Sequence, residues 1–220
     1  MVYLFPKIMP VFMSLHIKLP LSTRMVIFLS TFITNHGMAI IATLLSLIII
    51  FVILLKKSTL FHFYFDKLMM KIPLIGNIIR AYNLSNSTRT MGLLLKSGIV
   101  ISEALPIAEK TTTNLVYKKE FRNLTETVNR GDRISTYLNT RRSLFPNVLS
   151  QIISVGERSG NLSNSLIYLS ELYETEVDDF TKNISSLIEP AMMIVMGVLV
   201  GFIAISIITP IYSITQNLHG

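Results

Sequence analysis

Cysteine and charged residues are the scarce components of this chain of 220 residues. Cysteine is absent, which excludes disulfides, thiolate metal sites and cysteine nucleophiles. Charged residues make up 15% of the sequence, against about 25% in an average soluble domain. Hydrophobic residues make up 50%, and the mean hydropathy is +0.54. This composition argues against a disordered chain and against an ordinary cytosolic enzyme.

The familiar catalytic motifs are also missing. The sequence has no H-E-x-x-H zinc motif, no G-x-x-x-x-G-K-[ST] phosphate loop and no G-x-S-x-G nucleophile motif. Glu157 and Arg158 are chemically able to exchange protons, but a lone glutamate is more often part of a salt bridge or a helix-end contact. We therefore expect no catalytic residue, no metal and no cofactor.

The distribution of charge is more informative than its total. A net charge of +7 is compatible with binding to nucleic acid or with a membrane protein. All 13 acidic residues and most basic residues lie between Lys56 and Glu189, whereas residues 25–55 and 190–220 carry no Asp, Glu, Lys or Arg. This pattern indicates two membrane flanks around a polar domain, and no direct nucleic-acid partner.

Two segments, residues 38–55 and 190–214, are predicted to be transmembrane helices. Eighteen residues at about 1.5 Å each span about 27 Å, close to the thickness of the bilayer hydrocarbon. The alternative for the first segment is a buried core helix. In the second, Gly197 and Gly201 form a G-x-x-x-G pair that allows another helix to approach closely. Pro210 is expected to kink or end that helix.

Lysines predict the orientation of the chain in the membrane. Lys56, Lys57, Lys67 and Lys71 follow the first span closely, and such an excess is typical of the cytoplasmic side. We therefore predict a cytoplasmic domain at 56–189, an extracytoplasmic segment at 1–37 and an extracytoplasmic tail at 215–220. Prolines interrupt the first 24 residues, which do not resemble a signal peptide. We therefore expect this opening to resemble an internal stretch of a longer chain and not the start of one.

The middle domain is predicted to be all-α, with about six helices. Tyr117, Phe121, Leu124 and Val128 follow at spacings of 4, 3 and 4, which places them on one helical face, and no alternating strand pattern is evident. Three glycines stand where helices are expected to stop, and one proline suits a first helical turn: Gly98, Gly131, Gly160 and Pro146.

The last helix of this domain runs directly into the second span. Apolar residues recur at spacings of 3 and 4 between Leu162 and Leu187, which predicts a continuous seam at coiled-coil-like spacing. Glu189 and Pro190 stand at the junction, where proline removes a backbone donor and allows a bend. Such a helix is able to carry a push or twist into the membrane. The alternative is a packed bundle helix that happens to continue into a span.

Several segments, taken in order, resemble one protein family. They are LLLKSGIVISEALPIAEKTTTN at 93–114, NRGD at 129–132, LFP at 144–146, VGERSGNL at 155–162 and LIEPAMMIVMGVLVGFIAISIITPIY at 187–212. This set is similar to the type II secretion F domain, with its G-E-x-x-G signature and its E-P before the last span. The family is the inner-membrane platform protein of type IV pili and type II secretion. Its members usually have two such domains and three spans, so we expect a fragment or a shortened member that resembles the C-terminal half.

The resemblance implies a non-enzymatic scaffold in the cytoplasmic (inner) membrane. The expected partners are a cytoplasmic assembly ATPase, pilin or pseudopilin subunits, other inner-membrane assembly proteins and further copies of the chain. By the same resemblance, Gly156, Glu157 and Gly160 form a structural turn, and Glu189 and Pro190 set the angle of entry into the membrane. The alternative is a membrane-anchored helical subunit of a transporter or signalling complex.

Overall fold

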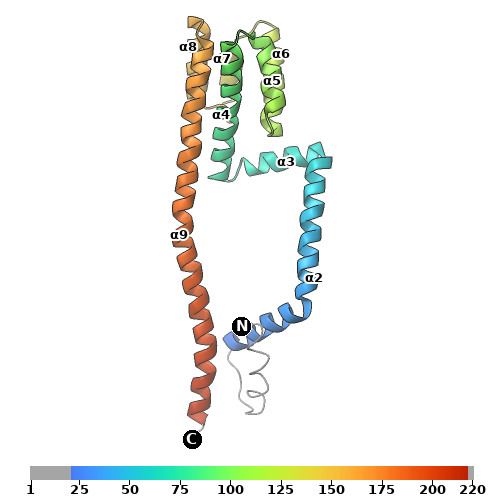
Figure 1. The fold of residues 1–220 in the computed structure, drawn as a ribbon, viewed down its shortest axis with the longest axis vertical. Helices are drawn as coiled ribbons and strands as arrows, with labels where there is room; N and C mark the ends of the chain where they lie inside the picture. Colours follow the sequence, from blue (N-terminus) through green and yellow to red (C-terminus); the bar gives the residue numbers. More distant parts are fainter. Residues whose placement is uncertain (1–20, 218–220) are drawn as a thin grey trace. The chain divides into compact units, whose positions relative to one another are not determined.

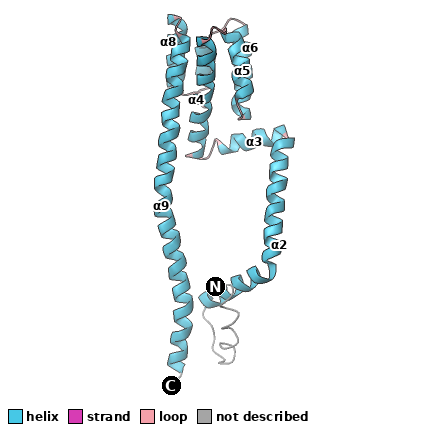
Figure 2. Cartoon of the chain, viewed as in Figure 1, coloured by secondary structure: helices cyan, strands magenta, loops and turns pink. Residues whose placement is uncertain are grey.

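The computed structural model describes residues 21–217 and leaves residues 1–20 and 218–220 undescribed. The described part contains helices and no strand (Figures 1 and 2), so the predicted all-α class is confirmed. The helices are α2 Leu21–Lys57, α3 Thr59–Met69, α4 Ile75–Lys96, α5 Ile101–Thr111, α6 Leu115–Asn129, α7 Ile134–Thr140, α8 Asn147–Ser159 and α9 Leu162–Asn217.

The chain divides into two compact units. One is the bundle, Leu54–Ser185; the other, here called the apolar unit, combines Met1–Ile53 with Ser186–Gly220. The bundle contains the six complete helices α3–α8 and the first part of α9. The extracytoplasmic and cytoplasmic assignments of these segments remain predictions.

Aromatic and aliphatic side chains fill the core of the bundle. The predicted face of α6 is buried at Tyr117, Phe121 and Leu124, and Val128 packs against it. Phe145 lies edge-on to two of these rings, with centroid distances of 5.7 Å to Tyr117 and 6.3 Å to Phe121. The periodicity therefore identified the buried side of this helix correctly, because burial of an apolar stripe is what stabilises an amphipathic helix.

Three bundle helices end in the same way. Gly98, Gly131 and Gly160 follow α4, α6 and α8 with φ of 87°, 92° and 70°, a left-handed conformation that glycine adopts without steric cost. In each case the next N–H donates to the carbonyl five residues earlier, at 3.0–3.3 Å, which is the Schellman arrangement. Pro146 is the N-cap of α8, one position before its first turn.

The turn between α3 and α4 is tight and was not predicted. Leu74 has φ 67° and ψ −61°, and Ile75 N–H donates to Pro73 C=O at 3.0 Å. This is a γ-turn with positive φ, the rarer and more strained form. Gly76 follows, and a Cβ at this position would lie 2.3 Å from the Met70 carbonyl oxygen. Only glycine fits here, because the two backbone segments touch.

The apolar unit contains segments of two helices that are long and apolar enough to cross a membrane. The candidate spans are Thr31–Lys57 and the apolar part of Leu162–Ile205, and the apolar window of each has no buried residue. In the described structure the first segment is therefore exposed and is not packed as a core helix. The helix that contains the predicted span 38–55 begins earlier, at Leu21, because 25–37 also carries no charged side chain.

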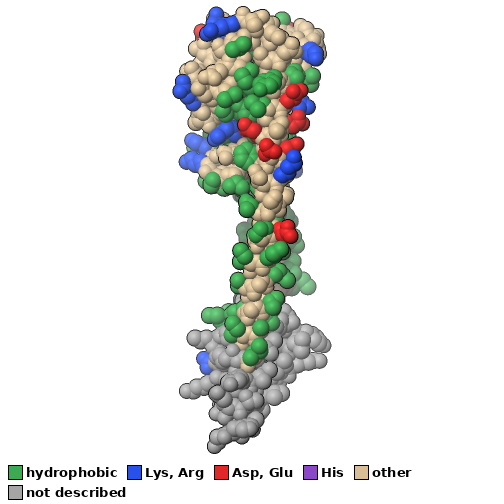
Figure 3. Space-filling view, turned by 90° about the vertical axis from the view of Figure 1, so that its left-hand side faces the viewer, with side chains coloured by type: hydrophobic (Ala, Val, Ile, Leu, Met, Phe, Trp, Pro, Cys, Tyr) green, Lys and Arg blue, Asp and Glu red, His purple; other side chains and the backbone are tan. Residues whose placement is uncertain are grey.

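Hydrophobic side chains stand exposed along the lower part of α9 (Figure 3). At Gly197 and Gly201 nothing described lies within 4 Å of an added Cβ, so this G-x-x-x-G surface is open in the described structure. The helical assignment of α9 runs through Glu189, Pro190 and Pro210 to Asn217. The side chain of Pro210 and residues 218–220 of the predicted tail lie outside what the structure describes.

Candidate functional site: the anchorage of α9

Gly156 allows α8 and the start of α9 to touch. A Cβ at Gly156 would lie 2.6 Å from Ser165 Oγ, 2.9 Å from Ser165 Cβ and 3.1 Å from Leu162 Cα. Real Cβ contacts are longer than this, so any larger residue has to displace α9. The first glycine of the G-E-x-x-G segment is therefore a contact point between two helices.

Glu157 caps the N-terminus of α7. Its Oε1 accepts a hydrogen bond from Ile134 N–H at 2.7 Å, and its Oε2 accepts from Ser135 N–H at 3.3 Å and from Ser135 Oγ at 2.5 Å. The first N–H groups of a helix have no partner inside that helix, and their partial positive charge favours a carboxylate. The sequence left proton exchange, a salt bridge and a helix-end contact as roles for Glu157. Its hydrogen bonds to the first residues of α7 support the helix-end contact.

Gly160 completes the junction by ending α8. Both Gly160 N–H and Asn161 N–H donate to Gly156 C=O, and the carbonyl of Asn161 accepts from Ser165 N–H at 3.2 Å in the first turn of α9. The five residues 156–160 thus hold three helix ends together. They join the C-terminus of α8, the N-terminus of α7 and the start of α9.

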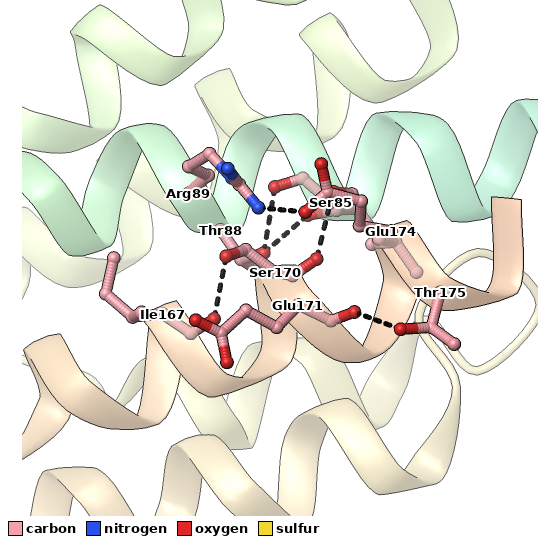
Figure 4. Close-up of polar contacts among 9 residues, drawn as sticks. Ser85, Thr88, Arg89, Ile167, Ser170, Glu171, Glu174 and Thr175 are labelled. Carbon is pink, nitrogen blue, oxygen red and sulfur yellow. Dashed lines mark hydrogen bonds and ion pairs between the residues drawn. The ribbon is translucent and has the colours of Figure 1, made fainter. Parts of the chain in front are cut away.

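Helix α4 provides the second anchorage of α9, through small and hydroxyl-bearing residues (Figure 4). Ser85 Oγ donates to Ser170 C=O at 3.0 Å, and Arg89 pairs with Glu174 one turn further along each helix. At Gly92 an added Cβ would lie 2.9 Å from Ile167 Cδ1 and 3.1 Å from its backbone nitrogen. Short side chains on α4 therefore bring the two helix backbones close together.

Two buried tyrosines belong to the core that α9 packs against or joins, Tyr117 on α6 and Tyr173 on α9 itself. Burial raises the pKa of both Tyr117 and Tyr173, and the nearby Arg80 guanidinium opposes the shift in each. Tyr117 donates its hydroxyl hydrogen to Leu144 C=O at 2.8 Å, which requires the neutral phenol. Tyr117 is thus a packing and hydrogen-bonding group, whereas Tyr173 packs in the core with its hydroxyl unpaired among the described residues. Among the described residues, no three His, Asp or Glu side chains lie close enough together to hold a metal ion.

The predicted seam of α9 is buried over part of its length. Leu166, Leu169 and Tyr173 belong to the core, and Leu162 and Val177 pack against it, whereas Leu187 is 61% exposed. The acidic residues of this helix lie exposed on its surface, as a solvated face requires: Glu171, Glu174, Glu176, Asp178 and Asp179. Glu189 and Pro190 are exposed as well.

The α4 side of this anchorage was missed in the sequence. The signal that could have revealed it is the series Ser85, Thr88 and Gly92, small residues at spacings of 3 and 4 on one helical face. The buried residues of this helix mix apolar and polar side chains, such as Leu84 and Met91 beside Asn83 and Ser87, so periodicity of apolar residues did not single it out.

The Arg89–Glu174 pair is expected to contribute little to stability. Its side chains are 43% and 55% exposed, and exposed ion pairs are worth roughly 0.2–1 kcal/mol. We expect a double-mutant cycle of Arg89→Ala and Glu174→Ala, read from thermal unfolding of the full chain in micelles, to give a coupling energy within that range. A coupling of several kcal/mol would show that the pair is a main attachment of α9, contrary to this reasoning.

Comparison with known proteins agrees with this architecture. Residues 87–210 match the family described as "Type II secretion system (T2SS), protein F". The matched range begins in α4, at the second anchorage of α9, and ends in the apolar part of α9 itself. It includes the whole α7–α8–α9 junction.

Individual relatives extend the similarity to nearly the whole chain. The type IV pilus assembly protein PilC of Pseudomonas aeruginosa is 31% identical over 95% of this chain and 56% of its own length. TapC of Aeromonas hydrophila, also a type IV pilus assembly protein, is 28% identical over 97% and 52%. Type II secretion system protein F of Pseudomonas aeruginosa is 28% identical over the same shares. The chain spans about half the length of these relatives.

The matched family range covers more than half of the chain, and one relative is 31% identical over 95% of it. Both findings agree with the resemblance in the ordered motifs. They also agree with the two apolar helices and the helical bundle. The chain belongs to the type II secretion system protein F family.

Proposed function

We propose that this chain acts as a non-catalytic inner-membrane platform in the assembly of a type IV pilus or a type II secretion pseudopilus. In this role it couples a cytoplasmic assembly ATPase to the insertion of pilin or pseudopilin subunits. The observation that carries the proposal is α9, one helix from Leu162 to Asn217 that begins in the bundle core and ends in an apolar segment. The names of the relatives support a role in type IV pilus assembly or type II secretion.

A helix of this kind suits mechanical coupling for a physical reason. Each residue adds about 1.5 Å and each backbone hydrogen bond stiffens the rod, so a displacement at one end moves the other. Contacts at Gly156 and along α4 hold the start of α9 in the bundle. A force on the bundle surface is therefore passed along the helix instead of being absorbed in a loop.

The topology and partners follow from the same proposal. The bundle faces the cytoplasm, where the ATPase acts, and 38–55 and 190–214 span the membrane. Gly197 and Gly201, where nothing described lies within 4 Å of an added Cβ, provide a surface for a second copy of the chain or for a neighbouring membrane helix. Glu189 and Pro190 set the direction in which α9 enters the bilayer, and Pro210 shapes its far end.

Interrupting α9 between its two parts tests the coupling. Four glycines inserted between Ser185 and Ser186 create a flexible joint, whereas four alanines at the same place keep the helix and rotate it by only about 40°. In cells that rely on the variant gene, we expect the glycine insertion to reduce assembled pili or secreted protein more than tenfold. The alanine insertion is expected to retain a large share.

Equal membrane levels of both variants are the control, measured by immunoblot of membrane fractions. Equal assembly by the glycine and alanine variants would contradict rigid coupling through α9. Hydrolysis of ATP by the purified chain alone would contradict the non-catalytic role.

A further inference from the structure

Helix α3 has an apolar face that the bundle does not cover. Leu60, Tyr64 and Leu68 follow one another at spacings of four residues and are 72%, 66% and 57% exposed. At this spacing they form one stripe along the helix. The helix starts only two residues after Lys57, the end of the first candidate span.

The opposite face of α3 is fastened to the bundle. Asp66 Oδ2 accepts a hydrogen bond from Leu115 N–H at 2.7 Å, at the start of α6. Lys119 Nζ lies 5.7 Å from the centre of the Phe63 ring, a cation–π distance. Because these contacts fix the rotation of α3, the stripe of Leu60, Tyr64 and Leu68 has to point away from α6.

A basic pocket lies beside this attachment. Its volume is about 410 Å³, and four cationic side chains from α3, the turn after it, α4 and α6 line it: Lys67, Lys71, Arg80 and Lys119. The one acidic lining residue is Glu120, whose carboxylate already accepts from Tyr137 Oη at 2.7 Å and pairs with Arg141 at 3.4 Å. The pocket therefore offers positive charge that the described bundle does not neutralise locally.

Arg80 adds a second indication that the pocket takes an anion. Its Nε is buried and has no hydrogen-bond partner among the described residues. A buried donor of this kind costs free energy unless an acceptor reaches it. Arginine and lysine together are the usual ligands of a phosphate group, since arginine offers planar paired donors and lysine a mobile point charge.

We infer that α3 lies in the membrane interface and that the pocket lined by Lys67, Lys71, Arg80 and Lys119 holds the phosphate of an anionic phospholipid. The apolar stripe enters the boundary between headgroups and acyl chains, and the basic residues receive the headgroup. Helices with one apolar and one basic side bind membranes in this way. Basic residues just beyond a span are attracted to an anionic leaflet by the same charge.

The exposed stripe distinguishes a lipid from a soluble phosphate compound. A free phosphate would explain the basic pocket but not the three large apolar side chains exposed on the helix that contributes Lys67. A lipid explains both, because its headgroup and acyl chains are joined. The pocket and the stripe would then anchor the bundle to the bilayer at a point separate from the two spans.

The position of α3 is testable with a single fluorescent label, because the chain has no cysteine. Tyr64→Cys labels the stripe, and Asn161→Cys labels the turn between α8 and α9, which lies at the other end of the bundle from α3 (Figure 1). In nanodiscs of the full chain that contain spin-labelled lipid, we expect at least threefold stronger quenching at position 64 than at 161. Equal quenching at the two positions would overturn the interfacial placement.

Headgroup binding is measured with a label inside the pocket, at Ser143→Cys. We expect the emission to shift when phosphatidylglycerol is added to phosphatidylcholine nanodiscs, and not when inorganic phosphate is added to discs of phosphatidylcholine alone. A shift with inorganic phosphate that phosphatidylglycerol does not increase would assign the pocket to a soluble anion and overturn the lipid. No shift with either would overturn the site.

Charge-removing variants complete the test. In K67Q/K71Q/K119Q the apparent affinity for phosphatidylglycerol is expected to fall about fivefold for each lysine removed, the factor that corresponds to about 1 kcal/mol per basic residue at an anionic surface. The emission shift is therefore expected to disappear over the range of phosphatidylglycerol fractions to which the parent chain responds. The control K96Q/K110Q removes exposed charge from the same bundle outside the pocket and is expected to respond like the parent. Equal responses of the two variants to phosphatidylglycerol would overturn the proposal. If the triple variant does not fold, the emission of the Ser143→Cys label in the parent chain, titrated with phosphatidylglycerol and with inorganic phosphate, decides the case.

Discussion

Replacing Gly76 with alanine is expected to lower the free energy of unfolding by about 2–3 kcal/mol. An added Cβ would lie 2.3 Å from the Met70 carbonyl oxygen and 2.8 Å from its carbonyl carbon. Both are backbone atoms, so relief requires the turn between α3 and α4 to open. The gain of about 1 kcal/mol that alanine has over glycine inside a helix offsets only part of this cost.

Thermal unfolding of the full chain in detergent micelles, followed by circular dichroism, measures the effect of Gly76→Ala. For a chain of this size the midpoint is expected to fall by about 4–12 °C. Gly37→Ala is the matched control, because Gly37 is also helical but has nothing within 4 Å of an added Cβ. A midpoint for Gly76→Ala equal to that of the control would show that the turn is not held as tightly as these distances require.

Replacing Glu157 with alanine is expected to destabilise the α7–α8–α9 junction by about 2–3 kcal/mol. The change leaves the N–H groups of Ile134 and Ser135 and the Ser135 hydroxyl without the carboxylate that accepts from all three. Hydrogen bonds to charged groups contribute roughly 1.5–3 kcal/mol each, and losses within one network are not additive. Glu157→Gln keeps the shape and one acceptor oxygen, so its effect is expected to be about half as large.

Hydrogen exchange followed by mass spectrometry measures this change where it occurs. We expect amide exchange at the start of α7, residues 134–136, to become faster in Glu157→Ala, together with a lower unfolding midpoint. The control is Glu126→Ala, at an exposed position of α6, where surface substitutions usually change stability by less than about 0.5 kcal/mol. Unchanged exchange in α7 would mean that the cap does not stabilise this helix in solution.

These two residues differ in how far the sequence revealed them. Glu157 stood out in the G-E-x-x-G segment, and the sequence favoured a salt bridge or a helix-end contact over a catalytic role. Gly76 did not stand out, because its constraint comes from Met70, six residues earlier across a turn. No periodic pattern records a contact of that kind, and neither the γ-turn at Leu74 nor the small residues of α4 follow from local preference.

The sequence by itself determined the helical class, the two apolar segments, the buried face of α6 and the glycine ends of three helices. These features depend on interactions among residues close together in the chain, such as amphipathic periodicity, uninterrupted apolar length and the conformational freedom of glycine. Only the tertiary structure decided that Glu157 caps α7, that α4 receives α9, and that Lys67, Lys71, Arg80 and Lys119 share one pocket. Those groupings join residues up to 85 positions apart, and packing of the whole bundle is what brings them together.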